Sequence, residues 1–509
     1  MIPLLYSALL AVCLSACTTN TPPSPTPITP DDATDTYVTT IERGGYTTFF
    51  KPQIAWVGDV MPFYDEKSDV FHIFYLQDWR PATGIIHPIW AVETKDFATY
   101  TNNREAIPVG RNYEQDVVIG TGGAIRDEAG LYHFFYTGEM MDNPLAHQAV
   151  MHATSKDLVT WQKDRSFGYM RASDGYNVHD FRDPCVFRSP DDDVYHMSVT
   201  SHWHGSNALA HLTSSDLIHW TPAAEPLMKD APHFMECSDI FRMGKWWYAT
   251  YSSINHPRCV YYRYKEGSLY DPSGWSDPVA LDGRSFYAAK TAANKNGKRY
   301  LCGWVQTLAG IYDSSDWGGA LAVHELVQID GGPHLACRVP EGVKNKYSQD
   351  VQLIEQKSEH CTHNDDTYTL TANDGRSYVQ FNRLRSPMRI TCEIERITDS
   401  SIFGFTFATS SDEQKAQHLR FLLEPENNNK ADLAHDSDDK GQINWRSIAD
   451  IRDARTYDIT ICIEHSVAVL YVNDRIAFST RIYGMENNPW QVFCEKGAVS
   501  IHDLEIHTY

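Results

Sequence analysis

Three acidic side chains occupy similar apolar surroundings in the N-terminal half of the sequence. Asp59 lies in AWVGDVMPF, Asp183 in FRDPCVF and Glu236 in FMECSDIF. A carboxylate among apolar residues must be paired or hydrogen-bonded, or its pKa rises, because removing its hydration costs several kcal/mol. Each acid is therefore either a satisfied structural group or a reactive one, and the choice depends on whether the three meet in space.

Carboxylates that converge in a partly dry cavity repel one another, so at least one pKa should rise while another group stays ionised. That division suits glycoside hydrolysis, in which one carboxylic acid protonates the leaving oxygen and a carboxylate about 5–5.5 Å away attacks the anomeric carbon with retention. Three carboxylates could alternatively hold a divalent cation. Arg182 lies next to Asp183 and would oppose a cation, so we expect the hydrolytic site and no metal.

The elements that would bring the acids together repeat along the chain. Five segments rich in aromatic residues and β-formers predict buried strands, and their starts lie roughly 50 to 65 residues apart. This spacing accommodates a four-stranded antiparallel unit, so five units predict a five-bladed β-propeller around a central cavity. The segments are FHIFYLQDW from Phe71, YHFFYTGE from Tyr132, YHMSVTSHW from Tyr195, WWYATYSS from Trp246 and RYLCGWVQ from Arg299.

The three acids lie at equivalent positions in this repeat. Asp59, Asp183 and Glu236 precede the first, third and fourth segments by about ten to twelve residues. Because the innermost strand of each blade faces the axis, equivalent positions converge at one end of the central cavity. A second pattern supports the repeat, since one turn and outer strand recur as TKDFATY (94–100), TSKDLVTW (154–161) and TSSDLIHW (213–220).

Other side chains near these motifs could bind a sugar. Arg182 can orient a carboxylate or donate to a sugar hydroxyl through its planar fork. His202 and His204 in SHWHG share one strand face, but without a further placed ligand we expect no metal site there. Aromatic rings close to the motifs could form a floor under a sugar ring: Trp56, Trp79, Trp90, Tyr287 and Trp317.

Composition excludes several classes of partner. The chain of 509 residues, with 42% hydrophobic and 12% aromatic content, provides for more than one large core. A net charge of −22 disfavours nucleic acid and anionic membrane surfaces, so a neutral ligand fits better. Nine cysteines from Cys185 to Cys494 form an odd set without paired CxxC spacing, so neither a disulfide framework nor a zinc site is predicted.

The N-terminus has the features of an export signal. The stretch MIPLLYSALLAVCLSACTTN contains a short apolar core, and LSAC at 14–17 resembles a bacterial lipoprotein box. This resemblance implies a signal peptide over residues 1–17, cleaved before Cys17, and acylation of Cys17 that anchors the chain in the periplasm or at the cell surface. No Lys or Arg precedes the apolar run, and an ordinary signal peptide is the alternative. The Pro- and Thr-rich residues 18–40 are typical of an extended tether.

Together, these motifs resemble glycoside hydrolase family 32, the group of invertases, levanases and inulinases. The resemblance extends over most of residues 45–509 and rests on the order and spacing of RDP (182–184), EC (236–237), GTGGAI (120–125), SFYAAKT (285–291), KRYLCGWV (298–305) and DWGGALAVHEL (316–326). It implies that Asp59 is the nucleophile, Asp183 the transition-state stabiliser and Glu236 the acid/base. It also implies substrate-binding positions, which we assign to Arg182, Trp56, Gln77, Trp90, Thr121, Cys237, Tyr287 and Trp317.

The surroundings of Asp59 depart from the family pattern. Where the family usually has NDPNG, this chain has GDVMP, so a side-chain donor before Asp59 and a polar group after it are absent. The usual Gln at the end of the first segment is displaced, with Leu76 in its place and Gln77 next. Since those groups help to hold the terminal fructose, the motifs define the acids more closely than the sugar.

We therefore predict an all-β chain with a five-bladed β-propeller over residues 41–340 and a β-sandwich over residues 345–509. In the sandwich, ITICIEHSVAVLYVNDRIAFSTRIYG (459–484) has alternating apolar positions and an Asn-Asp turn. The predicted activity is retaining hydrolysis of β-D-fructofuranosides in sucrose, fructooligosaccharides or fructan, without a cofactor. The alternatives are a hydrolase of another furanoside, such as an arabinofuranoside, and a noncatalytic glycan-binding lipoprotein. The expected partner is a carbohydrate, with membrane contact only through the lipid anchor.

Overall fold

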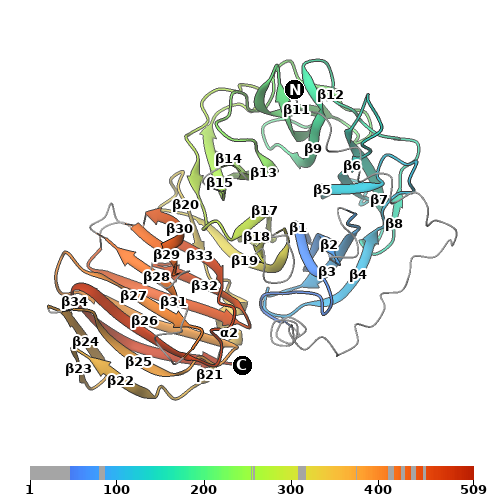
Figure 1. The fold of residues 1–509 in the computed structure, drawn as a ribbon. Coiled ribbons are helices and arrows are strands. Elements are labelled where there is room, and N and C mark those ends of the chain that lie inside the picture. Colours follow the sequence, from blue (N-terminus) through green and yellow to red (C-terminus); the bar gives the residue numbers. More distant parts are fainter. Residues whose placement is uncertain are drawn as a thin grey trace, which may run out of the picture.

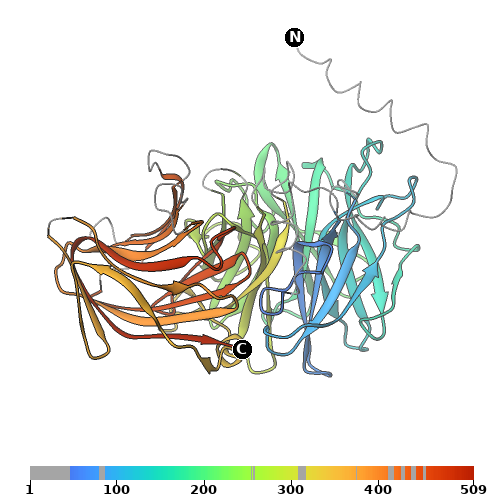
Figure 2. The ribbon, with the colours of Figure 1, turned by 60° about the horizontal axis from the view of Figure 1, so that its bottom comes forward.

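The computed structural model describes residues 46–79, 86–253, 255, 258–307, 317–373, 375–410, 418–425, 430–436, 443–450 and 454–509. The expected signal peptide, the tether and the lipidation position Cys17 lie outside these residues. Within them, the one α-helix is α2 (Glu341–Lys346), and no helix is both long and apolar enough to cross a membrane. The fold is all-β, as predicted, with a five-bladed β-propeller followed by a β-sandwich (Figure 1 and Figure 2).

Five antiparallel blades of four strands form the propeller, and Figure 1 shows β1, β5, β9, β13 and β17 innermost around the axis. The first blade comprises β1 (Trp56–Asp65), β2 (Val70–Asp78), β3 (Ile89–Thr94) and β4 (Thr101–Ile107). The second comprises β5 (Val118–Arg126), β6 (Tyr132–Glu139), β7 (Gln148–Ser155) and β8 (Trp161–Lys163). The third comprises β9 (Tyr176–Arg188), β10 (Tyr195–Trp203), β11 (Ser206–Ser214) and β12 (Thr221–Pro222).

The remaining two blades complete the ring. The fourth comprises β13 (Glu236–Met243), β14 (Trp246–Ser253), β15 (Cys259–Glu266) and β16 (Val279–Ala280). The fifth comprises β17 (Phe286–Ala293), β18 (Arg299–Gln306), β19 (Gly319–Gln328) and β20 (Leu335–Arg338). Pairing of Val57 with Gly319 joins β1 of the first blade to β19 of the last.

The five segments predicted as buried strands are the second strands of the blades: β2, β6, β10, β14 and β18. Nearly every residue in them is buried, because neighbouring blades pack against both faces of each sheet. Burial of both faces explains why these segments read as continuous apolar runs instead of alternating with polar residues.

Each innermost strand carries an irregularity of pairing at the same level. The shift falls at residues 57–60 in β1, 120–122 in β5, 182–185 in β9, 236–239 in β13 and 287–290 in β17. Within these bulges, Asp183, Cys237 and Ala288 have positive φ angles of 58°, 51° and 49°. A bulge leaves a residue outside the hydrogen-bond ladder and re-aims its side chain, and left-handed backbone at non-glycine residues is concentrated at functional sites.

The recurring turn predicted from the sequence links β3 to β4, β7 to β8 and β11 to β12. In each copy a Thr or Ser hydroxyl accepts a hydrogen bond from the backbone N–H three residues later, at 2.9 Å. The donating residues Phe97, Leu158 and Leu217 are buried and have φ angles of 59°, 62° and 64°. The side-chain oxygen satisfies the backbone of this tight turn, so the same sequence pattern builds the same connection in three blades.

The C-terminal domain is a β-sandwich of two sheets. β34 is twenty residues long; its first half pairs with β25 and β27, and its second half pairs with β24 and β26. It therefore contributes to both sheets, and a continuous apolar core lies between them. The strands are β21 (Gln349–Asp350), β22 (Glu355–Glu359), β23 (Cys361–Asn364), β24 (Thr367–Ala372), β25 (Ser377–Arg383), β26 (Met388–Arg396), β27 (Ile402–Ala408), β28 (His418–Glu424), β29 (Lys430–Asp436), β30 (Ile443–Asp450), β31 (Thr456–Glu464), β32 (Val467–Val472), β33 (Ile476–Arg481) and β34 (Pro489–Thr508).

Buried polar side chains of the sandwich hold the propeller at its first and fifth blades. Arg481 is 1% exposed and donates to the carbonyls of Val305 and Gln306 at 2.8 and 3.2 Å. The carboxylate of Glu464 accepts the backbone N–H groups of residues 47–49, just before β1, at 2.8 to 2.9 Å. Because these buried groups form hydrogen bonds across the domain boundary, the sandwich and the propeller stabilise each other.

Candidate active site

Asp59 lies in the bulge of β1 and receives two hydrogen bonds from other blades. Thr121 Oγ1 donates to Asp59 Oδ2 at 2.6 Å, and the indole Nε1 of Trp304 donates to Oδ1 at 3.2 Å. Burial raises the pKa of Asp59, the two donors oppose this rise, and the nearby charge of Glu236 adds to it. The carboxylate is therefore oriented at both oxygens while its proton affinity stays above that of an exposed aspartate.

Gly58 lets an aromatic ring approach the backbone beside Asp59. A Cβ atom on Gly58 would lie 2.2 Å from the Trp317 ring and 2.8 Å from the Leu76 carbonyl oxygen, so only glycine fits. Trp317 thus fills the space in which a side chain before the acid would project. This packing explains why no side-chain donor precedes Asp59, and Thr121 and Trp304 orient the carboxylate itself.

Asp183 is the most enclosed of the three acids, with 4% exposure. Its Oδ2 accepts the backbone N–H of Cys237 at 2.7 Å, and its own N–H donates to Thr137 Oγ1 at 2.8 Å. Burial raises the pKa of Asp183 to about 6, against the opposing effects of the Arg182 charge and the Cys237 N–H. The group therefore changes its charge state close to neutral pH.

Glu236 lies at the start of β13 and is held by a cation and a phenol. Arg182 Nη2 donates to Glu236 Oε1 at 3.0 Å, and Tyr287 Oη donates to Oε2 at 2.6 Å. Burial, together with the charge of Glu236, strongly raises the pKa of Tyr287, so the phenol keeps its proton and acts as a donor. Both carboxylate oxygens of Glu236 are thus positioned by groups from neighbouring blades.

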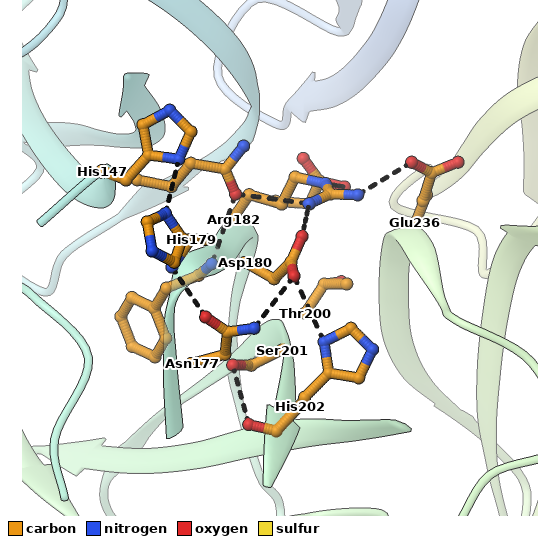
Figure 3. A network of polar contacts seen from close by, with 12 residues as sticks. His147, Asn177, His179, Asp180, Arg182, Thr200, Ser201, His202 and Glu236 are labelled. Carbon is orange, nitrogen blue, oxygen red and sulfur yellow. Dashed lines mark hydrogen bonds and ion pairs between the residues drawn. The ribbon is translucent and has the colours of Figure 1, made fainter. Parts of the chain in front are cut away.

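A polar network extends from Glu236 along β9 (Figure 3). Arg182 also donates to Asp180 Oδ1 at 2.7 Å and lies over the Phe234 ring at 4.5 Å. Asp180 Oδ2 in turn contacts His202 Nδ1 at 3.3 Å and accepts a hydrogen bond from Asn177 Nδ2 at 3.2 Å. The guanidinium is therefore fixed between two carboxylates and a ring.

The same strand is the longest of the innermost strands. β9 has 13 residues, whereas the other innermost strands have 8 to 10, and its first seven residues precede Asp183. At its outer part, His179 Nδ1 contacts His147 Nδ1 at 3.2 Å, and Figure 3 shows this pair continuing the network away from Glu236. The network therefore links Glu236 to the outer part of β9.

The structure brings most of the predicted site residues together. The three acids interact electrostatically, because Asp59 and Glu236 each affect the pKa of Asp183. Four of the predicted substrate-binding residues form hydrogen bonds with an acid, Arg182, Thr121, Cys237 and Tyr287, and Trp317 lies against Gly58 next to Asp59. Among the described residues, no group of three or more His, Cys, Asp or Glu side chains is placed to hold a metal ion.

Three other predicted residues make their described contacts elsewhere. Trp56 packs against the Lys51 ammonium at 4.6 Å, Gln77 accepts a hydrogen bond from Tyr75 at 3.0 Å, and Trp90 packs edge-on against Trp79 at 5.6 Å. Their assignment to substrate binding stays a prediction.

Trp304, Asp180 and Thr137 were not predicted, although each touches the site or its network. Trp304 lies in the motif KRYLCGWV, whose buried strand pattern gave no indication of a role beside Asp59.

The protein is thus a five-bladed propeller with three interacting carboxylates at its axis, followed by a β-sandwich. The chain belongs to glycoside hydrolase family 32: residues 49–336 match the family's N-terminal domain, "Glycosyl hydrolases family 32 N-terminal domain", and residues 333–506 match "GH32, BT1760-like, C-terminal domain". Among curated proteins, the sucrose-6-phosphate hydrolase of Vibrio alginolyticus is 27% identical over 319 residues, covering 57% of this chain and 62% of the relative.

Solved structures give the same fold. Fructan 1-exohydrolase IIa from Cichorium intybus aligns with a TM-score of 0.70 at 16% identity, over 91% of this chain and 98% of that one. The GH32 β-fructofuranosidase of Bombyx mori aligns with a TM-score of 0.68 at 16% identity, over 93% of this chain and 96% of that one.

Proposed function

We propose that this protein hydrolyses β-D-fructofuranosides with retention of configuration at the anomeric carbon. The proposal is supported chiefly by the meeting of Asp59, Asp183 and Glu236, from three different blades, at one end of the propeller axis. The sucrose-6-phosphate hydrolase and β-fructofuranosidase activities named for its relatives favour the same substrate class.

In the first step, Asp59 attacks the anomeric carbon of the fructosyl unit while Glu236 gives a proton to the leaving oxygen. The C–O bond to the leaving group breaks as the bond to the Asp59 carboxylate forms. Thr121 and Trp304 hold the two Asp59 oxygens during the attack. Asp183, with one oxygen fixed by the Cys237 N–H, accepts hydrogen bonds from sugar hydroxyls as positive charge develops on the ring.

In the second step, Glu236 removes a proton from water, and the resulting nucleophile releases fructose from Asp59. The two donors on Glu236, Arg182 and Tyr287, stabilise its ionised form, which is the form that this base step requires. In the first step Glu236 must carry a proton on one of these two oxygens, so the donor to that oxygen, Arg182 or Tyr287, must give way to it. Substrate binding beside Arg182 would allow that exchange.

Incubation with sucrose, sucrose-6-phosphate, levan and inulin, with detection of released fructose, tests the proposal. We expect release from at least one of them, β-fructose as the first anomer in NMR spectra, and loss of release in Asp59→Asn and Glu236→Gln. Release only from an aryl arabinofuranoside would overturn the substrate class. Calorimetric binding of a fructan without any turnover would overturn the enzymatic role.

We further propose that the protein acts on fructan outside the cytoplasm as a lipoprotein anchored through Cys17. Support comes from the sequence alone, namely the apolar signal, the LSAC box and the Pro- and Thr-rich tether. Metabolic labelling with a fatty acid should mark the wild-type protein but not Cys17→Ser. Labelling of both, or of neither, would contradict the lipid anchor.

A further inference from the structure

A cavity lies on the propeller axis, beyond the bulges as seen from the acids. It has a volume of about 470 Å³ and is lined by the parts of the innermost strands that follow the bulges: 61–64, 122–124, 185–188, 239–242 and 290–293. Its side chains take no part in the reaction proposed above. It is large enough for a solvated ion, because one water in the liquid occupies about 30 Å³.

The charge of this cavity is opposite to that of the chain. Among the described residues, its lining has four cationic side chains and a single carboxylate, that of Asp239, in a protein of net charge −22. The cations are Arg188, Arg242, Lys290 and Arg299. Electrostatic attraction therefore favours an anion at this end of the axis, whereas the opposite end gathers three acids.

The two outer arginines have partners on the surface. Arg188 contacts Glu128 at 2.6 Å, and Arg242 contacts Asp191 at 2.5 Å. These exposed ion pairs balance the charge at the mouth, so the excess positive charge belongs to the inner pair, Lys290 and Arg299.

The inner carboxylate is engaged by neutral donors. Asp239 Oδ2 accepts the N–H and the hydroxyl of Thr291 at 2.9 and 2.6 Å, and Oδ1 accepts the Cys185 thiol at 3.4 Å. Arg299 donates to Thr291 Oγ1 at 2.6 Å. The inner part of the cavity thus has two cations, Lys290 and Arg299, and one carboxylate, Asp239. One positive charge is left uncompensated there.

Lys290 is the group that lacks a partner. It is 3% exposed, and its Nζ makes no hydrogen bond to any residue that the structure describes. A buried ammonium without a hydrogen-bond acceptor is costly, because its three N–H donors have left water without replacement. An anion in the cavity would supply both the acceptor and the missing negative charge.

We propose that this cavity binds a small inorganic anion, held by the Lys290 ammonium with Arg299 as the second cation. Lys290 and Tyr287 lie on either side of the bulge in β17, and Asp239 and Glu236 lie on either side of the bulge in β13. The bound anion therefore stabilises the two strands that carry the acid/base and its phenol donor, from the opposite end of the axis.

Thermal unfolding at constant ionic strength tests this site in the whole protein, with sodium gluconate as the bulky reference and chloride, sulfate or phosphate as probes. We expect at least one small anion to raise the Tm by about 2–4 °C at saturation. Lys290→Met should abolish the rise, whereas Lys295→Met, a surface lysine of the same blade, should keep it. An equal rise in wild type and Lys290→Met, or no rise with any probe, would overturn the proposal.

Asp239→Asn provides a test of opposite sign should Lys290→Met fail to fold. Removing the competing carboxylate leaves Lys290 and Arg299 without a negative partner, so calorimetry should show anion affinity increased about tenfold. Unchanged or weaker binding in Asp239→Asn would also overturn the site.

Discussion

Replacement of Thr121 by valine should steepen the acid limb of the pH–activity profile or move it to higher pH. The Thr121 hydroxyl donates to Asp59 Oδ2 at 2.6 Å and lowers a pKa that burial raises. Valine keeps the shape of the side chain and removes the donor. A hydrogen bond to a charged group contributes about 1.5–3 kcal/mol, and about 1.4 kcal/mol corresponds to one pKa unit. The pKa of Asp59 should therefore rise by about one to two units.

The assay is kcat/KM for the best fructoside, measured from acid to alkaline pH. Asp183, whose pKa is about 6, must also be ionised, so wild-type activity should fall below about pH 6. In Thr121→Val, Asp59 takes up its proton at higher pH than in wild type, so the acid limb should become steeper or begin at higher pH, while the plateau above it stays within about threefold of wild type, because both acids are ionised there.

Thr250→Val is the matched control, since Thr250 is a buried hydroxyl without a hydrogen bond to any described residue. Its acid limb should coincide with that of wild type. A lowered plateau with an acid limb of unchanged position and slope in Thr121→Val would refute the reasoning, because it would mean that Thr121 only supports the fold or that Asp59 is not the ionising nucleophile.

Three further predictions concern other parts of the molecule. Tyr287→Phe removes a donor that stabilises ionised Glu236 and should slow the second step, lowering kcat about tenfold on an aryl fructoside, whose good leaving group leaves that step rate-limiting; a larger loss on sucrose than on the aryl fructoside would contradict the base role. Arg481→Met should reduce the free energy of unfolding by about 2–4 kcal/mol, because buried carbonyls such as that of Val305 lose their donor, and an unchanged urea midpoint would contradict this. His152 is buried and its pKa is lowered to about 4, mainly by burial. Because the folded value lies below the unfolded one of about 6.5, its stabilising effect is complete above pH 6.5 and falls by about 2 kcal/mol by pH 5, so urea unfolding of His152→Gln should depend less on pH across this range.

The meeting of the acids could be predicted because a propeller converts sequence repetition into spatial equivalence. Asp59, Asp183 and Glu236 stand at matching distances before matching strands, and innermost strands must face the axis whatever their details. The positions of the acids relative to the repeated strand pattern were sufficient to predict that they meet. No knowledge of side-chain packing was required.

The donors around the acids could not be predicted in the same way. Trp304 reaches Asp59 from a strand 245 residues later, and its surroundings in sequence are those of an ordinary buried strand. Gly58 is compatible with many turns, and only the approach of Trp317 shows why a side chain is excluded. Contacts of this kind depend on how two blades meet, which a local pattern does not encode.

The hydrogen bonds around the axis show how each acid depends on a neighbouring blade. Each acid is stabilised from the blade that follows its own: Asp59 by Thr121 of the second blade, Asp183 by the Cys237 N–H of the fourth, and Glu236 by the Tyr287 hydroxyl of the fifth.

Trp304 closes the circle by donating from the fifth blade to Asp59 in the first. Arg481 of the sandwich holds the backbone carbonyl of Val305, the next residue after Trp304. Since a buried carboxylate is costly unless it is hydrogen-bonded, no single blade could carry its acid alone. The acids at the axis therefore depend on donors from the blades beside their own, and through the contact between Arg481 and the strand of Trp304 the sandwich supports one of those donors.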